Sequence, residues 1–387
     1  MVARIFDGLR VIDCASYIAG PAAATVMSDF GAEVIKIEPP GMGDPYRSLA
    51  MRPAGAPMSP NWVMDARNKR SLAIDLASDG GRAVLRRLVS DADVFITNFP
   101  PPVRRKLGLR HEDLAPLNDR LIYASFTGYG ETGPEAEKPG FDVTAWWARS
   151  GLMDLVRSGP DATPARSLSG MGDHPSAMAL YGAIVTALYQ REKTGRGGLV
   201  GSSLLANGLW ANSCSVQQQL CNEPVAVQPA RAQAPFPSRN HYRCRDGRWI
   251  ILSILPTGDR WQRFCAVAGG NLGDTDPHAL TTQLDEIMAT RDFSDWAARL
   301  DAAGLIFGIV ARIEDVAQDE QAIAAGVLVP FENSSLMTVS SPFWLAGQDK
   351  VEPRRAPEVG EHNDAVLRAA GYSAEEIEEF RAAGVVG

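Results

Sequence analysis

Asp173 is the strongest candidate for a reactive residue, because of the residues beside it in the sequence. It follows Gly170-Met171-Gly172 and precedes a long helix-compatible stretch, so we expect it at a helix N-terminus. One hypothesis is an N-cap aspartate, which needs only one backbone N–H as its partner. The other is a reactive carboxylate, because flanking glycines leave room for a substrate and free N–H groups of the helix end could hold a developing oxyanion. The residues alone favour the first hypothesis, and both can hold together.

Other polar residues give weaker signals. Asn98-Phe99 follows a strand-like run, at the edge where ligands bind in open α/β sheets, although a polar strand cap would look the same. Lys106 and Lys138 lie in loop-like surroundings, where a lysine is usually only solvated. We interpret His174 and His362 as structural, because no spacing supports a catalytic triad or a metal-ligand set. We do not interpret the glycine-containing segments, including Gly41-Met42-Gly43, as a nucleotide phosphate-binding loop, and we predict no metal site.

The length and composition of the chain limit the classes of protein to which it can belong. A chain of 387 residues exceeds the ~250–300 residues at which a single core stops growing, so we expect two domains. The formal net charge of −8 argues against nucleic acid or an anionic membrane as a partner. Five cysteines without a CxxC or Cys/His cluster favour a reducing compartment, hence the cytoplasm. We find neither a secretory signal nor a run near the ~20 apolar residues of a membrane span.

The N-terminal half alternates short apolar runs with helix-like stretches. This alternation predicts an α/β fold with a mostly parallel sheet. The expected strands are 9–16, 34–37, 72–76, 94–97 and 121–126. The expected helices between them include the Ala-rich stretch that follows Ala19-Gly20-Pro21 and runs through Phe30, and 80–89.

A change in composition divides the chain. Residues 224–237 contain four prolines and no periodicity, which is typical of a linker. After it, 242–255 carries Asp246-Gly247 between apolar runs and predicts a hairpin. Together with amphipathic stretches it predicts a small α+β domain. The expected helices are 261–267, 281–289, 294–300 and, near the C-terminus, 374–383.

A series of short motifs resembles one enzyme family, in family order and over essentially the whole chain. The chain is similar to the family III CoA-transferases, of the formyl-CoA transferase and carnitine CoA-transferase type. The superfamily also contains α-methylacyl-CoA racemase. The motifs are Ala19-Gly20-Pro21, 30–38 (FGAEVIKIE), Asn68-Lys69-Arg70-Ser71, Asn98-Phe99, Gly128-Tyr129-Gly130, Gly172-Asp173, 193–197 (KTGRG) and Gly360-Glu361-His362.

The resemblance implies a chemistry. Asp173 matches the catalytic aspartate of the family, a nucleophile that forms acyl-anhydride and aspartyl-CoA intermediates. The implied substrates are an acyl-CoA and a small carboxylic acid, with no tightly bound cofactor. Lys106 stands where the family has an arginine and can still serve a phosphate, without the bidentate fork. The positions that match CoA-contacting residues are Ile18, Ala19, Ile74, Asp75, Leu76, Ala77, Asn98, Phe99, Pro100, Lys106 and Lys138.

The resemblance also implies an architecture. We expect a large Rossmann-like CoA-binding domain over 1–223, a linker over 224–237 and a small α+β domain over 238–328. Residues 329–387 are expected to return to the large domain. Two chains are expected to interlock as a homodimer.

Two alternatives stay open. A 2-methylacyl-CoA racemase, or another acyl-CoA isomerase of the superfamily, needs two acid/base groups. The racemase branch has Gly-His-Asp where this chain has Gly140-Phe141-Asp142, and phenylalanine cannot move a proton. A non-enzymatic CoA-thioester-binding homologue would have lost the aspartate, yet Asp173 is present.

Overall fold

The computed structural model describes residues 4–49, 58–270, 272 and 276–387. The chain divides into two compact units. The first combines the described parts of 1–152 with 166–217 and 323–387, and the second combines 153–165 with the described parts of 218–322. The boundaries expected from the sequence stay predictions, because compactness alone does not show where an independently folding domain ends.

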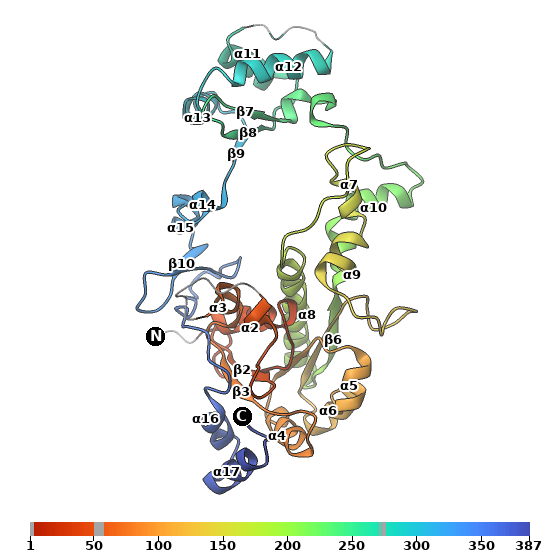
Figure 1. Ribbon diagram of the computed structural model, residues 1–387, viewed down its shortest axis with the longest axis vertical. Helices are drawn as coiled ribbons and strands as arrows, with labels where there is room; N and C mark the ends of the chain where they lie inside the picture. Colours follow the sequence, from red (N-terminus) through yellow and green to blue (C-terminus); the bar gives the residue numbers. More distant parts are fainter. Residues whose placement is uncertain (1–3, 50–57, 271, 273–275) are drawn as a thin grey trace. The chain divides into compact units, whose positions relative to one another are not determined.

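A six-stranded parallel sheet forms the centre of the first unit (Figure 1). Its order, β3-β2-β1-β4-β5-β6, is that of a doubly wound Rossmann-type sheet. The predicted α/β class with a parallel sheet is therefore confirmed. The strands are β1 (Arg10–Asp13), β2 (Glu33–Glu38), β3 (Arg70–Ala73), β4 (Val94–Thr97), β5 (Ile122–Thr127) and β6 (Gly198–Ser203).

The central strands are apolar because helices cover both faces of the sheet. Every residue of β4 and β5 is buried, as expected for parallel strands between two helical layers. The third strand was predicted two residues too late: β3 begins at Arg70, opposite Ile35 of β2. Ile74 lies beyond the ladder and instead forms an isolated antiparallel bridge with Val386 near the C-terminus.

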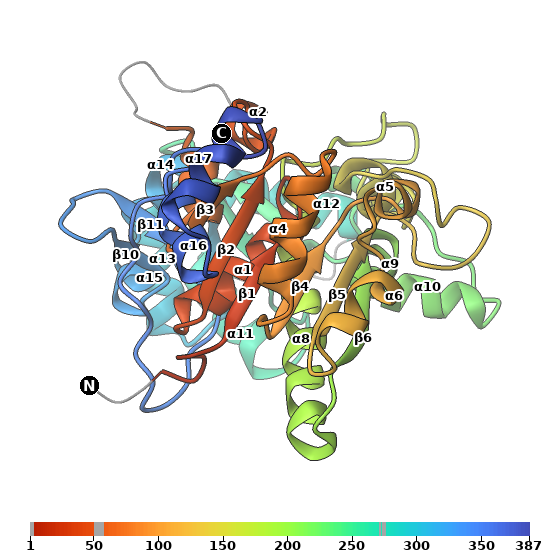
Figure 2. The same cartoon turned by 90° about the horizontal axis from the view of Figure 1, so that it is seen from below.

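Two helical layers enclose the sheet. Helices α1 (Ala19–Asp29) and α8 (Asp173–Thr194) pack together on one face. Helices α4 (Asp79–Val89), α16 (Asn363–Ala369) and α17 (Ala374–Ala382) cover the other face, where Figure 2 shows α4 in front of the strands. On that second face, leucine and valine side chains of α4 and α16 join strand residues in one apolar core.

The described part of the second unit contains a three-stranded antiparallel sheet that packs with the unit's three longest helices. The predicted hairpin is confirmed, with β7 (His241–Arg243) paired to β8 (Trp249–Leu252) and Gly247 at a positive φ of 78° in the turn. A third strand, β9 (Phe307–Val310), pairs with β8. Phe264, Leu284 and Trp296 lie in its core. The helices are α11 (Gly258–Ala268), α12 (Pro277–Met288) and α13 (Phe293–Ala302).

No helix of the described residues is long and apolar enough to cross a membrane. The remaining elements are α2 (Tyr46–Leu49), α3 (Pro60–Ala66), α5 (Pro101–Leu107), α6 (His111–Leu114), η1 (Ala115–Leu117), η2 (Asp142–Ala148), α7 (Leu152–Leu155), α9 (Leu204–Ala211), α10 (Ser213–Leu220), η3 (Arg231–Gln233), η4 (Pro237–Arg239), α14 (Ile313–Val316), α15 (Glu320–Ala324), β10 (Leu328–Pro330) and β11 (Met337–Val339).

Candidate active site

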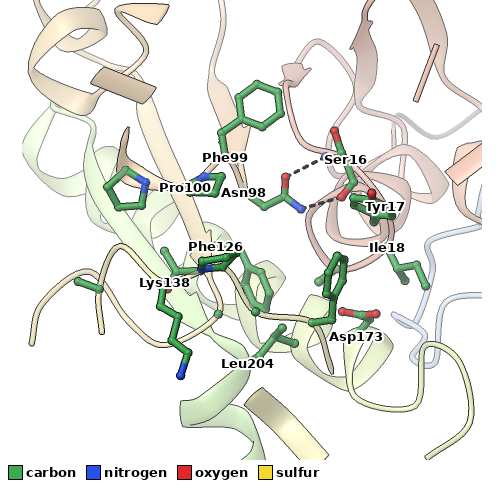
Figure 3. Close-up of a pocket in the computed structure, with 18 of the residues that line it drawn as sticks. Ser16, Tyr17, Ile18, Asn98, Phe99, Pro100, Phe126, Lys138, Asp173 and Leu204 are labelled. Atoms are coloured by element: carbon green, nitrogen blue, oxygen red, sulfur yellow. Dashed lines mark hydrogen bonds between the residues drawn. The ribbon is translucent and has the colours of Figure 1, made fainter. Parts of the chain in front are cut away.

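A cavity of about 290 Å³ lies in the first unit, beyond the carboxyl ends of β1 and β4. The order of the sheet reverses between these two strands, and such a switch point is where open α/β sheets bind ligands. Most of the lining is apolar or aromatic, with few polar side chains (Figure 3). The lining residues include Ser16, Tyr17, Ile18, Ala19, Asn98, Phe99, Pro100, Phe126, Lys138, Phe141, Asp173 and Leu204.

Asn98 fixes the loop that follows β1. Its side-chain Oδ1 accepts a hydrogen bond from the backbone N–H of Ser16 at 2.8 Å, and its Nδ2 donates to the Ser16 carbonyl at 2.6 Å (Figure 3). Both ends of the amide are therefore used in joining β4 to this loop. Asn98 is more than a strand cap, because it sets the position of the cavity wall formed by 16–19.

Two buried lysines, Lys36 and Lys69, also fix the position of the loop that follows β1. The Lys36 ammonium lies 2.8 Å from Asp44 Oδ2 and also donates to the Ala15 carbonyl. Lys69 bonds Asp13 Oδ2 at 2.9 Å and the Pro21 carbonyl at 2.7 Å. Burial opposes the charge on Lys36, but nearby carboxylates hold its pKa above the ordinary value. The loop is thus built on ion pairs rather than on an apolar core alone.

Asp173 is the first residue of α8, and Gly172 is the N-cap. No side chain caps the helix, and among the described residues no hydrogen bond reaches the Asp173 carboxylate. The N-cap hypothesis is therefore wrong. The oxyanion hypothesis also loses most of its donors, because the amides of His174 and Ser176 donate to the carbonyls of Gly170 and Gly172. Pro175 has no N–H to offer.

Gly172 is needed where it stands because Trp146 packs against it. A Cβ at this position would lie 2.6 Å from the Trp146 ring, too close for any side chain. The Gly172 amide faces Asp142 Oδ2 at 3.4 Å. This packing brings the start of α8 against η2 and places Asp142 close to Asp173.

The carboxylate of Asp173 is poorly solvated. Burial raises its pKa to about 7, and the negative charges of Asp142 and Asp65 act in the same direction. The neighbouring His174 opposes them. A carboxyl group with a pKa near neutrality, facing a cavity, is a candidate for covalent or acid/base chemistry.

The structure gathers part of the expected CoA site. Ile18, Ala19, Asn98, Phe99, Pro100 and Lys138 line the cavity together with Asp173. Lys138 is half-exposed, and its ammonium lies 3.0 Å from Glu135 Oε1 and over the Tyr129 ring. Lys106 is exposed on α5 and does not line the cavity. Neither do Ile74, Asp75, Leu76 and Ala77, which follow β3, and their contact with CoA stays a prediction.

Several neighbours of Asp173 gave no signal in the sequence. Tyr17 has a positive φ of 64°, and its ring meets Phe141 edge-to-face with centroids 5.6 Å apart. Asp65 lies on α3, far from Asp173 in the chain. Only the tertiary fold brings them together, so no local spacing could have identified them.

Comparison with known proteins gives consistent results. The profile of CoA-transferase family III matches residues 6–363. The chain is 31% identical to (R)-2-hydroxy-4-methylpentanoate CoA-transferase of Clostridioides difficile, over 99% of both chains. It is 30% identical to cinnamoyl-CoA:phenyllactate CoA-transferase of Clostridium sporogenes, over 97% of this chain and 96% of that one. A crystal structure of a CaiB/BaiF family protein from Brucella suis superposes with a TM-score of 0.85 at 27% identity, covering 95% of this chain and all of that one.

Proposed function

The chain belongs to CoA-transferase family III, and from this premise we propose that Asp173 carries coenzyme A between an acyl-CoA thioester and a carboxylic acid. The matched relatives are named as CoA-transferases, so CoA transfer is the general activity. The covalent route through aspartate is our proposal. One observation carries it: a carboxylate with no hydrogen-bond partner among the described residues faces a cavity at the switch point.

The proposed first half-reaction loads CoA onto the enzyme. A carboxylate oxygen of Asp173 attacks the thioester carbonyl, the C–S bond breaks and CoA leaves as a thiolate, so that a mixed anhydride remains. The thiolate then attacks the aspartyl carbonyl of the anhydride and releases the donor acid as its carboxylate. The product is an aspartyl-CoA thioester, and no proton is gained or lost in the two steps.

The second half-reaction reverses these steps with a different acid. The acceptor carboxylate attacks the aspartyl thioester and expels CoA thiolate, giving a new anhydride. The thiolate attacks the acceptor's carbonyl, which forms the new acyl-CoA and restores the Asp173 carboxylate. A poorly solvated carboxylate suits this role, because weaker hydration and a pKa of about 7 make the oxygen more nucleophilic than that of an ordinary aspartate.

The racemase alternative would need a second acid/base group facing Asp173. Phe141 lines the cavity where the racemase branch has its histidine, and it carries no proton. For this reason we favour the transferase. Incubation of a 2-methylacyl-CoA in deuterated water without an acid separates the two: a racemase exchanges the α-proton, whereas a transferase leaves it in place.

Mass detection of new thioesters tests the proposed function directly. Acyl-CoA donors would be offered with a panel of acids, beginning with the acids in the relatives' names, 2-hydroxy-4-methylpentanoate and phenyllactate. Omitting the acceptor and adding hydroxylamine should modify the peptide that carries Asp173. Transfer to an acid while that peptide stays unmodified would contradict the covalent route.

The proposed setting is the cytoplasm, and the proposed assembly is an interlocked homodimer. The compartment rests on the five cysteines without a paired pattern, and the assembly rests on the family resemblance. Secretion of the native protein would contradict the first proposal.

A further inference from the structure

Both ring nitrogens of His174 face hydrogen-bond acceptors. Nδ1 lies 3.1 Å from the carbonyl oxygen of Gly170, and Nε2 lies 3.1 Å from Oδ1 of Asp65. A carbonyl oxygen can only accept, so Nδ1 carries a proton. Nε2 also carries one if Asp65 is ionised, and the imidazole is then a cation.

Asp65 is buried, and both of its carboxylate oxygens face side-chain partners. Its side chain is 5% exposed, and its second oxygen, Oδ2, accepts the Tyr46 hydroxyl at 3.0 Å. Oδ2 thus has a donor, and Oδ1 gains a second one from His174 Nε2 when the imidazole is protonated. Burial and the Asp65 carboxylate hold the pKa of the Tyr46 phenol above its ordinary value, so Tyr46 keeps the proton it donates.

Gly170 makes room for the histidine ring. Its φ of +74° is a conformation that side chains rarely adopt, and a Cβ there would lie 3.1 Å from Cε1 and Nδ1 of His174. The Gly170-Met171-Gly172 segment thus serves two packing contacts, one with the imidazole and one with Trp146. The glycines before Asp173 position its neighbour as well as exposing the carboxylate.

The start of α8 collects three carboxylates, those of Asp173, Asp142 and Asp65. We propose that His174 is an imidazolium and a positioning residue, which keeps Asp173 ionised by offsetting the charges of Asp65 and Asp142. This role deepens the proposed function and rests on it, because a covalent nucleophile must lose its proton first. In agreement with the geometry, Asp65 holds the pKa of His174 above its ordinary value despite burial, and His174 lowers that of Asp173.

Other titratable or charged groups face this cluster. Tyr46 of α2 contacts Asp65, and Asp44 nearby is paired with Lys36. Arg67 follows Asp65 on the chain, but its guanidinium is engaged by Asp29 at 2.6 Å. Tyr17 and Lys138 face the cavity beside Asp173. The Lys69 ammonium also interacts with Asp65, but it bonds Asp13 Oδ2 at 2.9 Å. His174 contacts Asp65 directly and adjoins Asp173 in the chain, so it acts on both carboxylates.

NMR of the protein labelled at histidine Cε1 measures the charge without any substrate. The chain has five histidines, and His174→Gln identifies the signal. His362 is an internal contrast, because its Nδ1 accepts the Ser71 amide and burial lowers its pKa. We expect His174 to titrate above the ordinary value near 6.5, and His362 below it. A neutral His174 ring at pH 7 would overturn the proposal.

The pH dependence of Asp173 acylation in a single turnover tests the effect on the nucleophile. In His174→Gln the acidic limb should move up by about one pH unit, so the rate falls about fivefold at pH 7 and recovers at high pH. Adding Asp65→Asn removes the uncompensated charge, and the double variant should return towards the wild-type profile. The exposed His278→Gln is the control and should leave the profile unchanged.

A purely structural role predicts a different pattern. His174→Gln would then lower the rate at every pH, and the double variant would be worse than either single variant. That pattern, or an unmoved acidic limb, would overturn the proposal. Absence of acylation in the wild type at any pH would instead contradict the proposed function, and the NMR midpoint would still decide the charge of His174.

Discussion

Asp173 and Asp79 occupy the same position in their helices, the first residue of α8 and of α4. The helix dipole therefore favours both carboxylates to a similar degree. Their surroundings differ: the Asp79 side chain is 100% exposed and paired with Arg82, whereas Asp173 faces the cavity. Any special reactivity of Asp173 must come from its burial and its neighbours.

This pair provides a matched test of the nucleophile. Asp173→Asn should abolish thioester exchange, with a loss of at least about a thousandfold, because an amide cannot form the anhydride. Asp79→Asn removes the same charge from the same helix position and should leave exchange unchanged. Coupled assay of CoA transfer measures both, and circular dichroism checks the fold. Substantial transfer by Asp173→Asn would exclude the aspartyl route.

The raised pKa of Asp173 also has a cost in stability. Between the unfolded value near 4 and the folded value of about 7, the folded state binds more protons, so the free energy of unfolding falls as pH rises. Asp173→Asn should therefore be more stable than the wild type at pH 8, by on the order of 4 kcal/mol. The difference should vanish below pH 4. Urea unfolding at both pH values measures it, and a variant less stable at pH 8 would contradict the prediction.

At the scale of the element, the loop after β1 and the start of α1 depend on residues in or next to three strands. Asn98 after β4 bonds Ser16, Lys36 of β2 bonds Ala15, and Lys69 before β3 bonds Pro21. The position of the cavity wall therefore depends on several strands of the sheet together.

Asn98→Ala removes both bonds to Ser16 and tests this arrangement. Each bond contributes about 1 kcal/mol, so we expect unfolding to be easier by roughly 2 kcal/mol. We also expect a KM for acyl-CoA that rises about tenfold with a smaller change in kcat, because binding must first order the loop. Steady-state kinetics measure the split. A fall in kcat alone would indicate that Asn98 acts on the chemistry instead.

The strands illustrate what apolar patterns can predict. The run 94–97 matched β4 at both ends because all of its residues are apolar or β-branched and buried. Gly198 and Gly201 interrupt the pattern of β6, and its pairing with β5 supplies order that its composition does not. The run 72–76 was displaced because Ile74 finds its partner in Val386, more than three hundred residues away.

The residues of the candidate site also differ in how far the sequence could predict them. Gly172-Asp173 gave a local signal, since glycines beside an aspartate before a helix are visible in the sequence. Its assignment as an N-cap failed because the helix begins one residue earlier than that hypothesis required. Asp65 and Asp142 are ordinary carboxylates in the sequence, and only the packing of α3 and η2 near the start of α8 gives them an influence on Asp173.

At the scale of the whole molecule, large apolar side chains remain uncovered in both units. Trp210 and Trp344 of the first unit are 81% and 79% exposed, and Ile313 of the second is 82% exposed. Single exposed apolar residues are common, but tryptophan is enriched where proteins associate. These side chains support the homodimer expected from the family resemblance.

The proposed homodimer predicts the results of two measurements. Light scattering should give a mass twice the 41.6 kDa of one chain, and that mass should persist on dilution if the chains interlock. Because unfolding then separates two chains, the Tm should rise with protein concentration, whereas a monomer's Tm would not change. Trp344→Ser should weaken this dependence if the residue lies in the interface, with the exposed Met42→Ser as control. A mass of one chain at micromolar concentration, with a constant Tm, would show that the chain works alone.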